Sequence, residues 1–292
     1  MEVMFRKSLL VVVLLLSSLT AFAEETPYQA NTLNWYLPDS PPGYIVSGPY
    51  KGHGYNDEML NLFIEKLPQY SHNKVVASYP RAVIEMSRGT GCLVGIYPSE
   101  ERKDLLHYSI VRQVVYANGL IIPSDLLSSI DHLIDDNNTI SLKALAAFSK
   151  GDLIGGVAKD RIYGQSIDGY IQAHKNSILV RASNNVFSSL LEMLDSSRID
   201  YTFGFPVELS YVSKKLDLKR SYRFIKIAEM PTFTKSYVAC SKSAEGKKII
   251  DMIDNQLSTI RSSGIVYSMY DKWLDESLVE QYRQYSNELF RQ

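Results

Sequence analysis

One stretch of the sequence combines residue types and spacing that suit the binding of an anion. Residues 92–97 (Cys-Leu-Val-Gly-Ile-Tyr) are typical of a short apolar strand, a Pro-Ser turn follows, and Arg102 stands at the opening of the next segment. A guanidinium there can present its planar fork to a carboxylate or phosphate through two parallel hydrogen bonds. The alternative is a solvated arginine that pairs with Glu100 or Glu101.

Signatures of enzymes are mostly missing. Residues 164–169 (Gly-Gln-Ser-Ile-Asp-Gly) miss the G-x-S-x-G nucleophile elbow because the last glycine comes one place late. Residues 149–152 lack the glycine spacing of a P-loop, and the Gly155-Gly156 pair is too short for a dinucleotide fingerprint. An enzyme would have to draw its acids and bases from Glu85, Glu208 and His53, none of which stands in a motif.

Short apolar strands alternate with amphipathic helical stretches from Leu33 onward. The first part of this pattern has strands expected at residues 33–37, 75–78 and 92–97, and helices expected at 56–67 and 82–88. This β-α-β-α-β order predicts a parallel sheet with helices on both faces. Residues 114–122 look extended and lead out of the unit.

A second α/β pattern follows. Helices are expected at residues 141–148, 163–173 and 186–194, and strands at 153–157, 178–180 and 201–205. Strands at 224–227 and 237–240 then lead to C-terminal helices at 247–261 and 264–274. We therefore expect two α/β lobes joined by extended segments, with residues 24–115 and 231–292 in lobe one and residues 116–230 in lobe two.

The N-terminus has the order of a secretory signal peptide. Arg6 and Lys7 precede a mostly apolar stretch at residues 8–19, and Ala-Phe-Ala at 21–23 forms a small-x-small cleavage signal. The apolar run is well short of the ~20 residues that a membrane-spanning helix needs. We expect cleavage before Glu24 and export to the periplasm, the alternative being an uncleaved N-terminal anchor.

Composition excludes some classes of partner. Loss of Glu2, Arg6 and Lys7 moves the formal charge from -1 to -2, so the chain lacks the concentrated basic surface that nucleic acids require. Two cysteines without a CxxC and five histidines without an HExxH predict no metal site. In an oxidising compartment Cys92 and Cys240 form either one bridge or two buried free thiols. The 20 tyrosines indicate either an amphipathic surface or a pocket lined by hydroxyl-bearing rings.

Several short motifs occur in a set order over residues 31–275. They are Gly54-Tyr55-Asn56-Asp57, the strand at 92–96 with Ser99-x-x-Arg102 behind it, Tyr108-Ser109, Arg198-Ile199-Asp200, and Gly264 with Tyr267, Tyr270, Lys272 and Trp273. In this order and spacing the chain resembles the family 3 bacterial extracellular solute-binding proteins of the amino-acid-binding type. The resemblance implies a two-lobed type II periplasmic-binding-protein fold, in which each lobe is a mostly parallel sheet flanked by helices and two crossovers form the hinge.

The resemblance also implies a ligand site. Arg102 would take the ligand's carboxylate, helped by the hydroxyl of Ser99. Aromatic residues would frame the cleft from one lobe, and the start of a helix in the other lobe would offer free N–H groups to an anion. The aromatic residues are Trp35, Tyr36, Tyr55 and Tyr97, and the helix start comprises Arg161 and Tyr163. Arg81 would either recognise an anionic ligand group or simply begin a helix.

One position departs from the family's pattern. Amino-acid binders usually carry an acidic residue four or five places after the x-x-Asp turn, where it holds the ligand's ammonium. Those places are Gly204 and Phe205 here, and Glu208 is nearby but out of register. A less cationic ligand than a free amino acid is therefore expected.

The resemblance further implies a disulfide, because in the family's topology the strands that hold Cys92 and Cys240 lie side by side. It implies a monomeric periplasmic solute-binding protein without a cofactor, which closes on a small carboxylate-bearing ligand. An ABC permease or a membrane sensor receptor would recognise the closed form. Two alternatives stay open: an exported enzyme on the same scaffold, such as a small lyase or dehydratase, and a ligand-free periplasmic interaction module.

Overall fold

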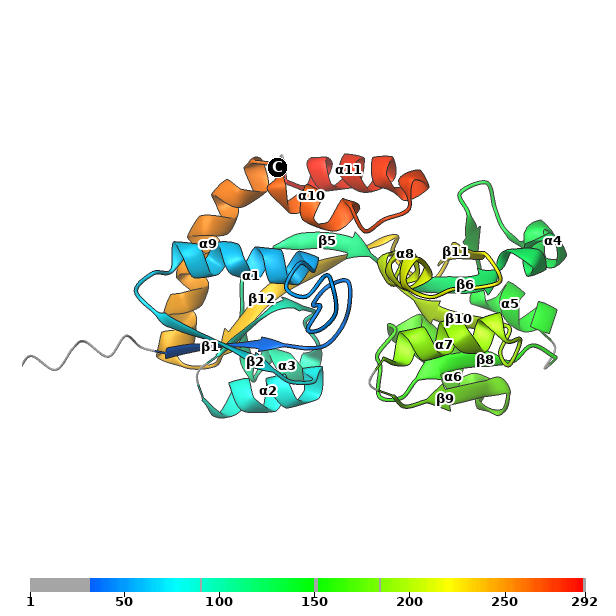
Figure 1. Cartoon of the computed structure of the whole chain (residues 1–292), viewed down its shortest axis with the longest axis horizontal. Coiled ribbons are helices and arrows are strands. Elements are labelled where there is room, and N and C mark those ends of the chain that lie inside the picture. Colours follow the sequence, from blue (N-terminus) through cyan, green and yellow to red (C-terminus); the bar gives the residue numbers. More distant parts are fainter. Residues whose placement is uncertain (1–31, 90, 150–151, 184, 291–292) are drawn as a thin grey trace, which may run out of the picture.

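A computed structural model describes residues 32–89, 91–149, 152–183 and 185–290. The predicted signal peptide lies outside the described residues. Figure 1 shows two α/β units, each built around one six-stranded sheet with helices packed against it. The α/β class expected from the alternation of strands and helices is confirmed. We call the two units the first and the second lobe.

The first sheet has the strand order β2-β1-β3-β12-β4, and β5 pairs with the remaining part of β12. The parallel strands are β1 (Thr32–Leu37), β2 (Ser71–Val76) and β3 (Cys92–Ile96). Against them, β12 (Phe233–Ser241) runs antiparallel to β3, β4 (Leu106–Tyr108) and β5 (Gln113–Tyr116). Every residue of β3 is buried, as expected of a central strand covered on both faces.

Four helices pack on this sheet: α1 (Tyr55–Lys66), α2 (Tyr79–Arg88), the short α3 (Glu100–Lys103) and α9 (Ala244–Ser262). The apolar positions of α1 recur at helical spacing, so Met59, Leu60 and Phe63 share one buried face. The first turn of α9 is capped by Ser243, whose Oγ accepts a hydrogen bond from the Gly246 N–H at 3.0 Å.

The second sheet has the order β7-β11-β6-β10-β8-β9. Its strands are β6 (Gly119–Pro123), β7 (Thr139–Ile140), β8 (Gly155–Ala158), β9 (Ile178–Arg181), β10 (Tyr201–Gly204) and β11 (Tyr222–Ile227). Its α-helices are α4 (Leu127–Ile130), α5 (Leu142–Ser149), α6 (Gln165–Ala173), α7 (Val186–Asp195) and α8 (Pro206–Lys215). In each sheet the strand that arrives from the other lobe runs antiparallel to a strand of the parallel set: β12 beside β3, and β6 beside β10.

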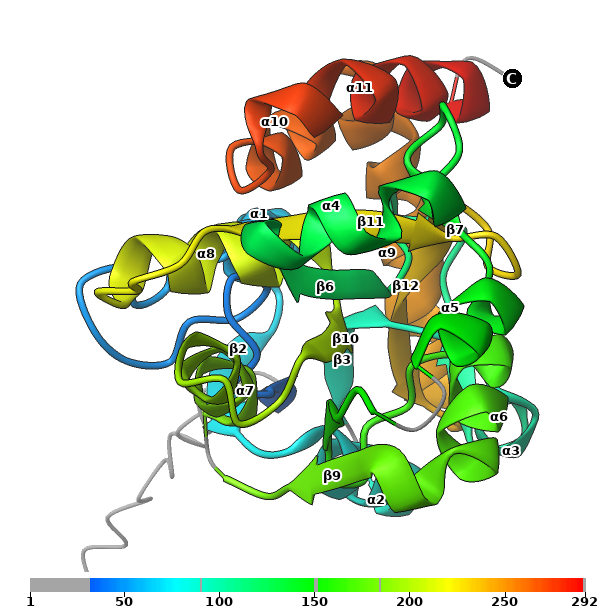
Figure 2. The same cartoon turned by 90° about the vertical axis from the view of Figure 1, so that its right-hand side faces the viewer.

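The chain crosses between the sheets twice, from β5 to β6 and from β11 back to β12. Two C-terminal helices, α10 (Ile265–Asp271) and α11 (Glu276–Phe290), lie along one side of these crossing strands (Figures 1 and 2). The backbone N–H of Tyr116 donates to the hydroxyl of Tyr270, and the hydroxyl of Tyr116 donates to the Leu278 carbonyl. The last helix is therefore docked on the hinge, and its own residues Tyr282 and Ser286 are fully buried in this contact.

Most of the elements expected from the sequence are present, with three informative differences. The segment expected to be extended over residues 114–122 is two strands, β5 and β6, which belong to different sheets. The second strand begins earlier than expected, at Ser71, because an edge strand paired only with β1 tolerates polar residues. Helix α8 was not among the expected elements, and it begins at Pro206, a residue that suits the first turn of a helix.

No described helix has the combined length and apolar character that crossing a bilayer demands. Within the same residues, no three His, Cys, Asp or Glu side chains come together as a metal-binding group would require.

The disulfide between Cys92 and Cys240 is confirmed. The two residues lie directly opposite each other in the antiparallel pair β3 and β12, with their Cα atoms 4.1 Å apart. The bond joins residues 148 positions apart and so closes a loop that includes the whole second lobe.

We predict that the double variant Cys92→Ala/Cys240→Ala folds with lower stability than the wild type. Removing a cross-link over so long a loop increases the entropy of the unfolded chain, which corresponds to a loss of about 2–5 kcal/mol. Urea unfolding under non-reducing conditions measures this loss. Dithiothreitol should lower the stability of the wild type and leave that of the variant unchanged, and equal stabilities without reductant would contradict the prediction.

Candidate functional site

The two lobes meet through side chains that follow the ends of strands β3 and β10. Tyr97 comes directly after β3, and Phe205 comes directly after β10. Their rings face each other across the junction, with centroids 6.4 Å apart and planes 28° apart. In open α/β sheets the carboxyl ends of parallel strands are the usual place for a ligand, so this contact marks the candidate site.

The residues around this contact form what we call the interlobe cluster. From the first lobe it contains Tyr55, Tyr79, Tyr97 and Arg112, and from the second lobe Arg161, Phe205 and Glu208. Burial raises the pKa of the Tyr55, Tyr79 and Tyr97 hydroxyls, while the positive charge of Arg112 acts in the opposite direction on all three. The hydroxyls are therefore neutral at pH 7 and can donate or accept hydrogen bonds.

The Gly54-to-Asp57 motif positions Tyr55 at the start of α1. A Cβ atom on Gly54 would lie 2.3 Å from the Gly43 carbonyl oxygen, so only glycine allows this close approach. The Asp57 carboxylate accepts hydrogen bonds from the N–H groups of Ile45, at 2.9 Å, and Gly54, at 3.1 Å. Together these contacts tie the loop before α1 to the helix and direct Tyr55 toward the junction.

Arg112 is the residue of the cluster that sequence reasoning missed. Its side chain is fully buried, and its Nη2 donates to the Oδ1 of Asn56 at 2.9 Å and the Oγ of Ser236 at 3.0 Å. Its Nε and Nη1 groups have no hydrogen-bond partner in the described structure. A single charged residue inside the apolar run Val-Arg-Gln-Val-Val was the available signal, because a charge is buried only with compensation.

Arg161 is held by its own lobe. Its Nη1 and Nη2 donate to the two carboxylate oxygens of Glu208, each at 2.8 Å, and Nη2 also donates to the Oδ1 of Asn118 at 2.9 Å. Its guanidinium carbon lies 4.9 Å from the Tyr163 ring centroid and 5.2 Å from that of Phe205. Burial alone would lower the pKa of Arg161, but the Glu208 carboxylate raises it above the ordinary value. The pair is thus a neutralised unit that faces the first lobe.

Arg102 and Ser99 lie at α3, directly after Tyr97. Ser99 precedes the helix and its carbonyl accepts the backbone N–H of Arg102 at 3.0 Å. The Nη1 of Arg102 donates to the Tyr97 carbonyl at 3.3 Å, and Glu100 pairs with Lys103 instead. Arg102 has no carboxylate partner among the described residues, so the alternative of an arginine paired with Glu100 or Glu101 is not observed.

Three residues expected around the cleft lie elsewhere. Trp35 is fully buried in the first lobe, stacked with Phe63, because its indole is on the face of the sheet that α1 covers. The ring of Tyr36 lies against Gly91, at the end of β3 opposite to Tyr97. Arg81 is in the first turn of α2 and pairs with Glu85 at 2.6 Å on an exposed face of that helix.

The N-terminus of α6 does not offer the free N–H groups that were expected there. The carboxylate of Asp168 accepts the N–H of Tyr163 at 3.0 Å and that of Gly164 at 3.2 Å. The hydroxyl of Tyr163 accepts the N–H of Ala158 at 2.7 Å. An internal carboxylate therefore already fills the place that an anionic ligand would take, and Tyr163 supports Arg161 through its ring.

The expected departure at Phe205 has a clear structural consequence. Phe205 stands where an ammonium-binding acid would be expected, and its ring occupies the junction. Glu208 lies one helical turn later and points into the same region, but both its oxygens are engaged by Arg161, and one also accepts the N–H of Phe205. The other two candidate acids or bases lie away from the cluster, since Glu85 pairs with Arg81 and His53 is exposed.

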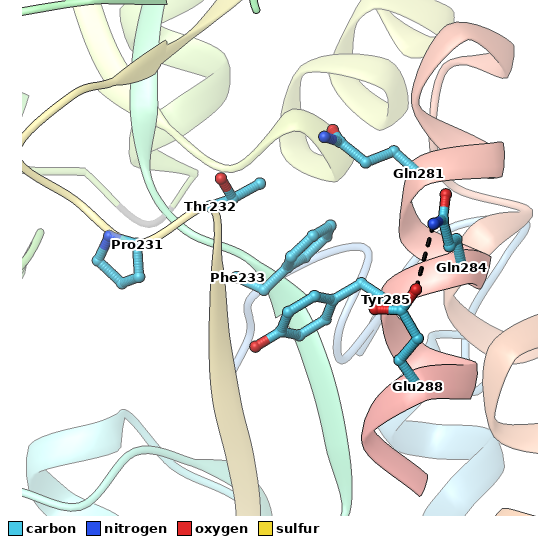
Figure 3. A pocket seen from close by; sticks show the side chains of 7 residues that line it. All are labelled: Pro231, Thr232, Phe233, Gln281, Gln284, Tyr285 and Glu288. Atoms are coloured by element: carbon cyan, nitrogen blue, oxygen red, sulfur yellow. Dashed lines mark hydrogen bonds between the residues drawn. The ribbon is translucent and has the colours of Figure 1, made fainter. Parts of the chain in front are cut away.

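A hollow of about 370 Å³ lies between the start of β12 and α11 (Figure 3). It is lined by Pro231, Thr232, Phe233, Gln281, Gln284, Tyr285 and Glu288. Tyr285 stacks on Phe233 with ring centroids 4.4 Å apart, and Gln284 donates to Glu288. None of the residues that line this hollow belongs to the interlobe cluster.

No protein-family model and no curated protein matches this sequence. Solved structures do match it in fold. The chain has the type II periplasmic-binding-protein fold.

One such structure is the probable amino-acid ABC transporter extracellular-binding protein YtmK from Bacillus subtilis, with 13% identity, a TM-score of 0.62, and coverage of 85% of this chain and 99% of that one. A histidine kinase sensor domain with similarity to periplasmic binding proteins has 15% identity, a TM-score of 0.59, and coverage of 84% and 96%. The ancestral amino-acid-binding protein AncCDT-1, a precursor of cyclohexadienyl dehydratase, has the same identity, TM-score and coverage. These likenesses confirm the fold that the sequence motifs implied.

We predict that Glu208→Gln destabilises the protein by about 3 kcal/mol. The substitution leaves the Arg161 guanidinium with an uncompensated charge in a largely buried place. Urea unfolding measures the loss, and Glu192→Gln, on the exposed side of α7, is the matched control. A loss equal to that of the control would show that the pair contributes little.

We also predict that Phe205→Ala increases the population of an open form. The substitution removes the ring that meets Tyr97 across the junction, and so removes part of the contact that holds the lobes together. Small-angle X-ray scattering should give a larger radius of gyration for this variant than for the wild type. Ile84→Ala, on the exposed face of α2, should leave the radius unchanged, and an unchanged radius for both variants would contradict the prediction.

Proposed function

We propose that this protein is an exported solute-binding protein that closes on a small polar ligand bearing a carboxylate. Lobe one would comprise residues 24–115 and 231–292, and lobe two residues 116–230. The ligand lies between Tyr97 and Arg102 on one side and Phe205 and Arg161 on the other. A membrane partner, either an ABC permease or a sensor receptor, recognises the closed form.

The observation that carries the proposal is the composition of the junction. Arg102 follows strand β3 of the first lobe without a carboxylate partner among the described residues, and its Nη1 donates to the carbonyl of Tyr97, whose ring stacks with Phe205 of the second lobe. A guanidinium without a carboxylate partner, bonded to the residue whose ring meets the other lobe, suits a carboxylate on a partly apolar solute. Ligand contacts from both lobes would favour the closed state over the open one.

The ligand class follows from the charges around the junction. Glu208 is the carboxylate of the interlobe cluster, and both its oxygens are engaged by Arg161, so it is not available to an ammonium group. Phe205 offers a ring in place of an acid. These features support a carboxylate without an α-ammonium group over a free amino acid.

The solved relatives in fold suit this proposal and also its alternatives. Several are named as amino-acid or cystine ABC transporter binding proteins, one is a histidine kinase sensor domain, and one is a dehydratase precursor. The engagement of Glu208 by Arg161 leaves the enzyme alternative without an unoccupied acid at the junction, so binding is the function that we propose.

The test is a thermal-shift and calorimetric screen of residues 24–292 with matched pairs of ligands. The pairs are succinate with aspartate, glutarate with glutamate, and 3-phenylpropanoate with phenylalanine. We expect the member without an ammonium group to bind better. At one hundred times its dissociation constant it should add about 2.7 kcal/mol of stability, which is a shift of several degrees.

Arg102→Ala should abolish this shift, while Arg88→Ala, which removes an exposed arginine of α2, should keep it. Tighter binding of the amino acid in each pair would overturn the proposed ligand class. A flat screen with folded protein would favour the interaction module.

A further inference from the structure

The most unusual group of the molecule is the buried guanidinium of Arg112. It carries five N–H donors, of which the described residues engage only those on Nη2. Both of its partners, Asn56 and Ser236, are neutral, and no carboxylate pairs with it among the described residues. An uncompensated buried cation is costly, so such a group is normally paired or bound to an anion.

The nearest acid along α1 does not serve as the counter-ion. The Asp57 carboxylate is directed to the N–H groups of Ile45 and Gly54, and so stabilises the loop before α1. Across the junction, Glu208 is held by Arg161. Burial lowers the pKa of the Arg112 guanidinium, and the groups that act against this effect are the hydroxyls of Tyr55, Tyr44, Tyr97 and Tyr282, which are uncharged at neutral pH.

The surroundings connect Arg112 to the junction between the lobes. Asn56, which holds Nη2, lies beside Gly95 of β3, where a Cβ atom would come within 2.5 Å of the Asn56 amide. Gly95 therefore leaves the space that Asn56 occupies. The Gly95 carbonyl accepts a hydrogen bond from the hydroxyl of Tyr79, and Tyr97 follows Gly95 by two residues. Arg112 therefore lies behind the tyrosines that the first lobe contributes to the interlobe cluster.

We propose that Arg112 is an anion-binding residue of this junction, whose Nε and Nη1 groups take a carboxylate of the ligand when the lobes are open. This inference rests on the proposed function and adds a second cationic position to Arg102. Arg112 is fully buried in this structure, so an anion would reach it only after the lobes part at the Tyr97–Phe205 contact. Closure then traps the anion against the tyrosine hydroxyls.

The test follows the arginine side chains directly. Residues 24–292, labelled with ¹⁵N at arginine side chains, are titrated with acetate, succinate and inorganic phosphate, and the Nε–H signals are recorded. The Arg112→Lys and Arg102→Ala variants assign two of these signals. We expect the Arg112 signal to shift in a saturable way, and Arg112→Gln to bind succinate at least tenfold more weakly in calorimetry.

Asn56→Asp provides a second test that does not remove Arg112. The new carboxylate would lie at hydrogen-bond distance from Nη2 and act as an internal counter-ion. We expect this variant to weaken succinate binding at least tenfold while it raises the melting temperature. Asn61→Asp, at an exposed position of the same helix where Lys74 donates to the amide oxygen at 2.8 Å, makes the same charge change away from Arg112 and should leave succinate binding unchanged.

The outcomes separate the two proposals. If succinate binds and depends on Arg102, but the Arg112 signal stays fixed, the inference about Arg112 is wrong and the proposed function stands. If the Arg112 signal shifts and Arg102→Ala binds as well as the wild type, the inference stands and the proposed role of Arg102 is wrong. If none of the three anions shifts either signal, both are wrong.

Discussion

The structure depends most on one strand, β12. Its first part pairs with β5 and passes between the lobes, and its second part pairs with β3 and β4 in the centre of the first sheet. The same strand therefore forms half of the hinge and a core strand of one lobe. Its register against β3 is interrupted between Tyr237 and Val238, which lets the strand change direction between the two tasks. The Cys92–Cys240 bond then joins β12 to its neighbour covalently.

Helices α10 and α11 add to this hinge from one side. Tyr116 of β5 bonds to Tyr270 and to the Leu278 carbonyl, and Gln113 donates to the hydroxyl of Tyr282. Between the two helices, the Trp273 ring contacts Tyr50 of the first lobe and Tyr211 of the second, with centroids 5.9 and 5.6 Å away. Because Tyr211 belongs to α8, any opening of the lobes must also move α8 relative to Trp273.

The two buried arginines of the junction show opposite solutions to one electrostatic problem. Arg161 is neutralised by Glu208 from the same lobe, with two hydrogen bonds of ideal length, and packs between two rings. Arg112 has amide and hydroxyl partners that satisfy part of its donors and none of its charge. In a low-dielectric interior the first arrangement is neutral without any added group, whereas the second favours an added negative group.

The alternation of apolar strands and amphipathic helices was enough to predict the α/β class, and the ordered motifs added the two-lobed fold and the disulfide partners. Local patterns carry this information because each strand or helix must bury its own apolar residues. The residue types of Gly54 and Asp57 also have an explanation in their near surroundings. Gly54 allows a close approach of two backbone segments, and the Asp57 carboxylate accepts hydrogen bonds from two nearby N–H groups.

The membership of the site was decided only by tertiary structure. Trp35 and Tyr97 both stand in or after a strand of the first sheet, yet one is in the core and the other at the junction. Arg112 and Glu208 stand outside every recognised motif, and Asp168 fills a helix N-terminus that looked free. The direction of a side chain, and the charge that meets it, depend on which distant segments pack together, so sequence spacing alone could not reveal them.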